Sequence, residues 1–223
     1  MLETRTTLAR LLLPRTAMLE QPLVRDGLLA VAGAALVALC AQISFPLPTT
    51  PVPVTMQTFA VLLVGALYGP RLGAITMLVY LAEGLAGLPV FAVGRSAWSP
   101  SSVPALPVIV GPTAGYLFAC PLAAALVGAL AARGWDRRVA SAVPAMLLGN
   151  LAILLCGFLW LAAATWALKG AVSIGALLAT SVLPFLPGDA IKLGLAALAL
   201  PGGWALLRTR RVGDPSPPER SAG

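Results

Sequence analysis

The sequence predicts an all-α membrane protein that crosses the bilayer with six helices and has both termini in the cytoplasm. Of its 223 residues, 59% are hydrophobic and only 10% are charged, and the mean hydropathy is +0.91. Soluble domains carry about 25% charged residues. Residues 27–70, 96–132 and 139–168 contain no charged side chain at all. Because a helix needs roughly 20 apolar residues to cross the hydrocarbon core, these three stretches alone hold about four spans.

Six apolar segments are the predicted spans, and the sequences between them favour loops. The spans cover residues 28–45, 56–69, 72–87, 111–132, 143–168 and 187–207. Residues 46–55 read PLPTTPVPVT, and residues 88–110 are again rich in proline, so both are predicted as rigid extended loops. Residues 173–183 are expected to form a short helix on the outer face. Pro184 interrupts this helix, and Pro187 is a natural first residue for the last span.

The distribution of basic residues predicts the orientation of the spans. Twelve arginines fall on one side of the predicted membrane, whereas Arg95 and Lys169 fall on the other and Lys192 lies within the last span. Cytoplasmic loops carry an excess of Lys and Arg. We therefore expect a cytoplasmic N-terminal segment (1–26), a six-helix substrate-binding domain (27–208) and a disordered cytoplasmic tail (209–223).

Several classes of function are excluded by what the sequence contains and lacks. The basic residues, which give a net charge of +7, lie at the ends of apolar segments and not in a stripe with aromatics, so we expect no nucleic-acid partner. The absence of histidine and of a GxxxxGK[ST] loop excludes His-based metal sites, Ser-His proteolysis and P-loop ATP hydrolysis. We expect no catalytic residue, metal or cofactor, which leaves an enzyme acting on lipid with little support.

Three ionisable residues within predicted spans are candidates for function, because charge inside a membrane is costly. They are Glu83, Asp189 and Lys192. Asp189 and Lys192 are three residues apart, so they share one helix face and can form a pair. Both lie in the outer turns of the last helix, where free backbone amides and the helix dipole favour anions. The alternative is a purely structural ion pair that fixes this helix.

Other polar residues extend the candidate site. Thr76, Tyr80 and Glu83 form a polar stripe on the third helix, and Gln57 lies at the outer end of the second helix, at the same level. Tyr80 is equally compatible with an interfacial aromatic residue. Asn150 lies in the middle of the fifth span, where its amide bonds either a neighbouring helix or a ligand.

Two further features each have two interpretations. Arg95, in the outer loop, is either a solvated charge or a clamp for an anion. Ala30, Ala34 and Ala38 form a stripe of small residues on the first helix. Such stripes allow close helix approach in lipid, so this one serves either internal packing or docking of another membrane subunit.

Four stretches carry a family resemblance and cover most of the chain from the second helix onward. They are TPVPVTMQTFAVLLVGALYGPRLG (50–73), VYLAEGLAGLPVFA (79–92), GPTAGYLFACPLAA (111–124) and LPFLPGDAIKLGLAAL (183–198). In combination they resemble the biotin-specific S-components (BioY) of energy-coupling-factor (ECF) transporters. That family has six helices with both ends in the cytosol, which agrees with the topology predicted from charge.

The resemblance implies a biotin pocket that opens outward under the outer loops, with Asp189 and Lys192 of the PGDAIK motif contributing to it. The ureido ring of biotin has two N–H donors and one carbonyl acceptor, which a carboxylate beside an ammonium group can satisfy. The valerate carboxylate needs a cation or free amides, and either Arg95 or the helix start near Gly111 can provide them. Residues 93–110, VGRSAWSPSSVPALPVIV, depart from the Gly-rich loop common in the family.

The predicted function is therefore a biotin-binding subunit in the bacterial cytoplasmic membrane. The resemblance implies that it works with a transmembrane coupling subunit and two cytoplasmic ATPase subunits. The alternative is a self-sufficient secondary biotin transporter, with Glu83 or Asp189 as the proton-coupling group. The role of Glu83 in either case rests on membrane physics alone.

Overall fold

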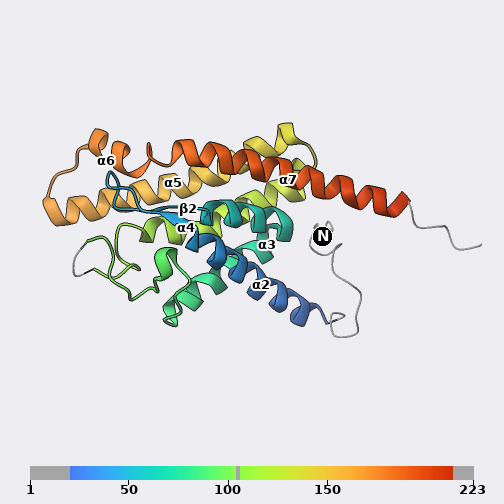
Figure 1. Ribbon diagram of the computed structural model, residues 1–223, viewed down its shortest axis with the longest axis horizontal. Coiled ribbons are helices and arrows are strands. Elements are labelled where there is room, and N and C mark those ends of the chain that lie inside the picture. Colours follow the sequence, from blue (N-terminus) through green and yellow to red (C-terminus); the bar gives the residue numbers. More distant parts are fainter. Residues whose placement is uncertain (1–20, 104–105, 213–223) are drawn as a thin grey trace, which may run out of the picture.

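The computed structural model describes residues 21–103 and 106–212, and this part of the chain is mostly helical (Figure 1). Its α-helices are α2 (Pro22–Gln42), α3 (Gln57–Leu85), α4 (Ala114–Ala132), α5 (Val139–Lys169), α6 (Ile174–Ser181) and α7 (Leu186–Val212). Two short 3-10 helices, η2 (Ala92–Gly94) and η3 (Trp135–Arg137), lie in the connections. The prediction of an all-α fold is confirmed. Most of the predicted N-terminal segment and tail lies outside the described residues.

Helix α3 contains two predicted spans, separated by a break at Gly69. This glycine has φ 82° and ψ 177°, a backbone conformation that other residues rarely adopt. The next residue, Pro70, has no N–H to continue the helical hydrogen bonds. The two limbs, residues 57–68 and 70–85, come close together, since a Cβ placed on Gly73 would lie 3.0 Å from the Cα of Gly65. With the limbs counted separately, each of the six predicted spans corresponds to a helical segment.

The helices have the length and composition of a multi-pass membrane protein. α2, α3, α4 and α5 are each long and apolar enough to cross a bilayer. The short helix expected over residues 173–183 is present as α6, where the Ser173 hydroxyl accepts a hydrogen bond from the amide of Ala176 at 3.5 Å. α6 and residues 186–202 of α7 form a further apolar pair bent by 47°. Helix α7 continues to Val212, beyond the predicted end at residue 207.

The loop between α2 and α3 contains a small antiparallel ribbon that the sequence did not predict. Strand β1 (Ser44–Phe45) pairs with β2 (Val54–Thr55), with Ser44 opposite Thr55. The prolines between the strands predict an extended loop, but proline content does not indicate which residues pair. The ribbon brings β2 next to the start of α7, because a Cβ on Gly188 would contact Val54 at 3.6 Å.

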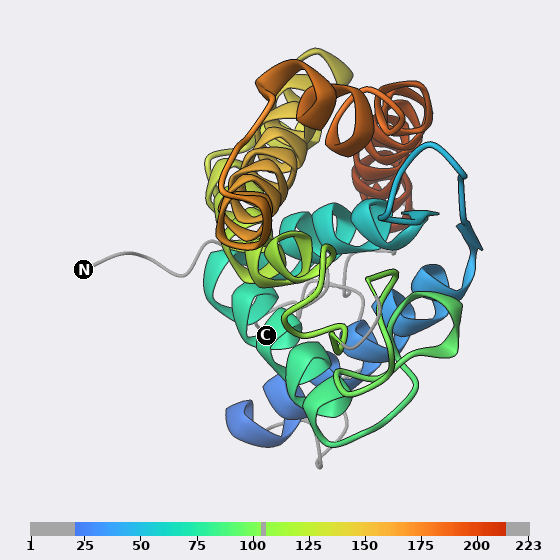
Figure 2. The same ribbon diagram turned by 90° about the vertical axis from the view of Figure 1, so that its left-hand side faces the viewer.

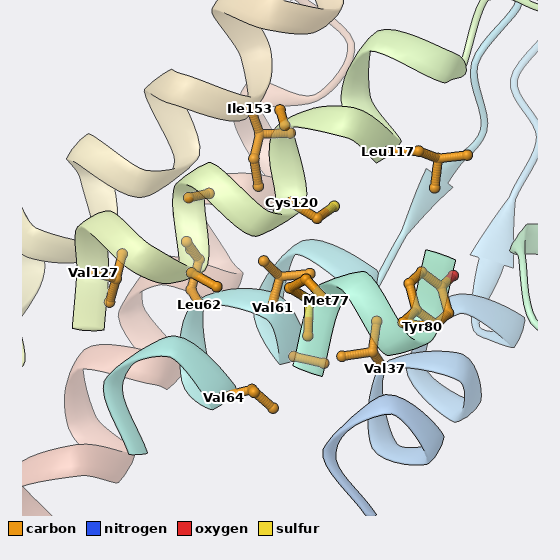
Figure 3. Close-up of a cluster of buried hydrophobic side chains, with 14 of the residues drawn as sticks. Val37, Val61, Leu62, Val64, Met77, Tyr80, Leu117, Cys120, Val127 and Ile153 are labelled. Carbon is orange, nitrogen blue, oxygen red and sulfur yellow. The ribbon is translucent and has the colours of Figure 1, made fainter. Parts of the chain in front are cut away.

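The core lies where α2, α3, α4 and α5 meet. Figure 3 shows Val37 of α2, Met77 and Tyr80 of α3, Cys120 of α4 and Ile153 of α5 in one cluster. Many leucines on the outer faces of the helices remain exposed, as expected for side chains that contact lipid. The buried core therefore holds the bundle together while the outer surface is as apolar as its interior.

The alanine stripe of α2 lies against α3. Ala34 has no exposed surface and Ala30 is 3% exposed, and Ala30 packs in a cluster with Leu72 and Tyr68 of α3. Ala38 packs on the edge of the main core. Ala30 and Ala34 are covered by the chain itself, which favours internal packing of these two residues, whereas Ala38 is half-buried. Docking of another subunit on this stripe stays a prediction.

The connecting loops divide between the two ends of the molecule. The loops over residues 46–55 and 88–110, together with α6, gather at the left-hand end in Figure 1 and face the viewer in Figure 2. The start of α2 and the end of α7 lie at the opposite end. This arrangement places the looped end, where the sequence predicts the site, away from both ends of the described chain.

Candidate functional site

A cavity opens at the looped end, between α3, α4, α5 and α7. The empty space between its lining residues, with the open mouth included, is about 770 Å³. Its polar lining comes from eight side chains: Thr55, Gln57, Thr58, Arg95, Thr113, Asn150, Asp189 and Lys192. Most of the remaining lining is apolar. Five of the seven ligand-binding residues predicted from the sequence therefore line one cavity.

A buried polar cluster forms part of the cavity wall. The Lys192 Nζ lies 3.1 Å from Asp189 Oδ1, and Asn150 Nδ2 donates to Asp189 Oδ2 at 3.0 Å. Asn150, Asp189 and Lys192 are each no more than 5% exposed. Asp189 is in the first turn of α7, where its backbone amide donates to Phe185 O at 2.8 Å. The ion pair inferred from the spacing of three residues is present, and Asn150 joins it from α5.

The cluster has hydrogen-bonding capacity beyond its internal contacts. A carboxylate offers about four acceptor positions and an ammonium group three donors, so Asp189 and Lys192 each retain unused positions. The Asn150 Oδ1 has no hydrogen-bond partner in the part of the chain that the structure describes. A ligand in the cavity can thus both donate to and accept from this cluster, which is the chemistry that recognition of a neutral polar ring requires.

Aromatic and aliphatic side chains form the rest of the wall, and no sequence pattern identifies them. They include Phe91, Leu117, Ile153 and Phe185. Tyr116 also lines the cavity; its hydroxyl donates to the Ser181 carbonyl at 2.7 Å and its ring centre is 5.8 Å from that of Phe185. Tyr116 and Phe185 do lie within the stretches that carry the family resemblance. Apolar residues give no signal of their own in a chain this hydrophobic.

Two other predicted residues contribute to the polar lining. The backbone of Arg95 pairs with that of Phe91 in both directions, at 2.8 and 3.3 Å. Its half-buried guanidinium group makes no hydrogen bond or ion pair among the described residues. Gln57 Nε2 lies 3.7 Å from Cys120 Sγ, a weak contact that leaves this amide available. Because the guanidinium group of Arg95 has no partner among the described residues, it supplies an uncompensated positive charge to the cavity.

Tyr80 and Glu83 do not line the cavity. Tyr80 is fully buried, its hydroxyl donates to Val90 O at 3.1 Å, and its ring meets Phe91 edge to face at 5.3 Å. Tyr80 thus packs against Phe91, which lines the cavity, but does not line it itself. Glu83 is half-buried on α3, outside the residues that surround the cavity. A direct contact of either residue with a ligand remains a prediction.

The fold and the cavity together define a class: a multi-pass helical membrane protein with a largely apolar cavity between helices and loops at one end. Residues 9–209 match the model of the BioY family. This chain belongs to the BioY family.

Individual relatives agree with this assignment. The chain is 37% identical over 164 residues to the "Probable biotin transporter BioY" of Pyrococcus horikoshii, covering 74% of this chain and 86% of the relative. It is 34% identical over 167 residues to the "Biotin transporter BioY" of Thermotoga maritima, with the same coverage of 74% and 86%. The Rhizobium etli "Biotin transporter BioY" is 31% identical over 193 residues, covering 82% and 96% of the two chains.

A solved structure has the same fold. It is described as the S-component for biotin from an ECF-type ABC transporter, and it superposes with a TM-score of 0.64 at 23% identity. The superposition covers 89% of this chain and 95% of that structure. The agreement therefore extends over nearly the whole helical bundle.

Proposed function

We propose that this chain binds biotin in the cavity and is the substrate-capture subunit, or S-component, of an ECF importer. The observation that supports this most directly is the Asn150–Asp189–Lys192 cluster, a buried ion pair with unused hydrogen-bonding positions in a largely apolar cavity. Biotin has a matching division of polarity, with a ureido group at one end, an apolar ring and a carboxylate on a flexible chain. The relatives named as biotin transporters support the same ligand.

The ureido group is assigned to the polar cluster. Its two N–H groups can donate to Asp189 and to the free Oδ1 of Asn150, while its carbonyl accepts from Lys192. Hydrogen bonds to the charged pair are roughly twice as strong as neutral ones. The thiophane ring then lies against apolar residues such as Leu117 and Phe185. This orientation leaves every polar group of the ureido ring with a partner.

The valerate carboxylate is assigned to Arg95. Of the two groups that the sequence offered, Arg95 lines the cavity with a free guanidinium group, whereas Gly111 is not among the lining residues. The Gly111 carbonyl accepts from Trp160 Nε1 at 3.0 Å. Thr113, the N-cap of α4, does line the cavity, but it carries no charge to match the carboxylate. An arginine can also bind a carboxylate through two parallel hydrogen bonds, which discriminates against uncharged analogues.

The proposal includes the orientation and the partners of the protein. The end that carries Arg71 at the α3 break and Arg133, Arg137 and Arg138 near η3 faces the cytosol, following the excess of basic residues. The cavity then opens to the outside of the cytoplasmic membrane. Since the sequence has no P-loop, energy for uptake comes from a transmembrane coupling subunit and two cytoplasmic ATPases.

Titration of the purified, detergent-solubilised protein with biotin, thiamine and riboflavin tests this function. We expect saturable binding of biotin and no saturable binding of the other two vitamins. The variant Lys192→Met serves as the site-specific control and should bind biotin about 10- to 100-fold more weakly than the parent. Absence of saturable biotin binding to the parent protein, or equal binding of thiamine, contradicts the proposal.

A further inference from the structure

The turn that precedes Arg95 has an unfavourable backbone conformation. Val93, in the middle of η2, has φ 61° and ψ 32° and is the sole non-glycine residue with a positive φ among those described. A β-branched side chain is a poor choice for this region of conformational space. Such a conformation persists only where surrounding contacts hold it in place. Contacts from the surrounding structure must therefore hold this turn.

The side chain of Gln42, the last residue of α2, spans the turn on both sides of Val93. Its Oε1 accepts a hydrogen bond from the Gly94 amide at 2.9 Å. Its Nε2 donates to the Phe91 carbonyl at 3.2 Å, with Val90 O at 3.5 Å beside it. These contacts join residues that are about 50 positions apart in the chain. The side-chain amide of Gln42 thus accepts from one backbone N–H and donates to one backbone carbonyl of the same strained turn.

Other contacts hold the flanks of this loop. The backbone pair of Phe91 and Arg95 closes the turn at its base, and Gln42 supplies the side-chain hydrogen bond to Gly94 within it. Tyr80 donates to Val90 O at 3.1 Å, before the turn, and Trp98 Nε1 donates to Leu85 O at 2.9 Å, after it. The ring of Phe91 packs on Gly84, where a Cβ would overlap it. Without Gln42, the flanks would remain in place while Val93 and Gly94 relaxed.

We infer that Gln42 is a positioning residue that sets the direction of Arg95 by holding the η2 turn, and so controls how strongly the site selects a ligand with a carboxylate. Gly94 immediately precedes Arg95, and the backbone of Arg95 pairs with Phe91, the other residue that Gln42 holds. The inference rests on the proposed function, in which Arg95 binds the valerate carboxylate. It assigns to the end of α2 a part in ligand selection, although Gln42 does not line the cavity.

The variant Gln42→Met tests this inference, because methionine has a similar length and lacks both hydrogen-bonding groups. Binding is measured by titration with biotin and with its primary amide, in which the carboxylate is replaced by an uncharged carboxamide. We expect Gln42→Met to weaken biotin binding by about tenfold, the equivalent of one hydrogen bond to a charged group, and to change amide binding little. Gln42→Asn, one methylene shorter, should show the same loss of selectivity and provides a second variant. Leu39→Ala, an exposed position near the end of the same helix, is the matched control and should behave as the parent does.

Parallel measurements on Arg95→Ala separate the possible failures. We expect Arg95→Ala to lose the preference for the acid, and the double variant Gln42→Met with Arg95→Ala to bind no more weakly than Arg95→Ala alone. Equal losses for acid and amide in both Gln42 variants overturn the inference and leave the role of Arg95 intact. Equal losses for acid and amide in Arg95→Ala overturn the carboxylate assignment itself. A parent protein that binds neither ligand contradicts the proposed function.

Discussion

At the scale of single residues, the candidate site contains a buried ion pair, Asp189 with Lys192, to which the proposed function assigns the ligand. Asp189 Oδ1 contacts Lys192 and Oδ2 accepts from Asn150, so one carboxylate connects two helices. Removal of one partner from a buried ion pair leaves the other as an uncompensated charge, whereas removal of both is often tolerated. Stability and ligand binding therefore respond differently to single and double substitutions here.

The first prediction at this scale concerns Asp189→Asn and Lys192→Met. Each single variant should lose about 3 to 5 kcal/mol of stability and weaken biotin binding by about 10- to 100-fold, as expected for a lost hydrogen bond to a charged group. The double variant should regain stability without regaining binding, because no orphan charge remains. Thermal unfolding in detergent and biotin titration measure the two effects. If the double variant binds biotin as the parent does, the pair is structural only.

At the scale of helices, the close contact of α4 with the break in α3 positions the cavity walls. Gly128 of α4 lies against the backbone of Gly69 and Pro70, so that a Cβ at this position would overlap main-chain atoms. Main-chain atoms cannot rotate out of the way as a side chain can, and glycine is thus required by the approach of α4 to the turn. The same approach brings Leu117 and Cys120 of α4 towards α3 (Figure 3).

Gly128→Ala is therefore expected to destabilise the protein by about 1 to 3 kcal/mol, the usual cost of an overfilled core. Gly194→Ala is the matched control on α7, where a Cβ meets no atom within 4 Å. There, alanine should stabilise the helix by about 0.5 to 1 kcal/mol. Thermal unfolding of both variants measures the difference. If Gly194→Ala lost as much stability as Gly128→Ala, close helix packing would not be the reason why position 128 requires glycine.

At the scale of the whole molecule, the outer surface and the cavity together indicate a subunit that captures ligand in the membrane. Leucines such as Leu39, Leu155 and Leu198 are more than half exposed on three different helices, as expected for contact with lipid or with another membrane protein. The residues that line the cavity belong to the looped end, which lies away from the start of α2 and the last turn of α7 (Figure 1). Under the proposed function, ligand that enters this cavity is released to the opposite side with the help of the proposed coupling partners.

Uptake of labelled biotin into membrane vesicles tests this assignment. We expect uptake only when the coupling subunit and ATPases are coexpressed and ATP is hydrolysed, because the chain itself cannot hydrolyse ATP by a P-loop. The control is vesicles that carry the chain alone with an imposed proton gradient. Uptake of biotin in that control would favour a secondary transporter instead, and Glu83→Gln would then show whether this half-buried carboxyl carries the proton.

The sequence by itself determined the helical segments, the loops between them and the pairing of Asp189 with Lys192. Bilayer thickness sets the length of an apolar run, glycine and proline mark the break at Gly69, and the helical period places residues three apart on one face. Each of these features depends on the local chain alone. For this reason the six segments, the turn within α3 and the ion pair could all be predicted without coordinates.

Only the tertiary structure decided which faces of these helices meet. It brought Asn150 to Asp189 across 39 positions and Gln42 to Gly94 across 52, turned Ala34 inward and left Tyr80 and Glu83 outside the cavity. In water, the apolar face of a helix identifies its buried side. In lipid, the surroundings are as apolar as the core, so hydrophobicity does not distinguish the two, and the rotation of each helix is set by close contacts such as that of Gly128, which come from distant parts of the chain.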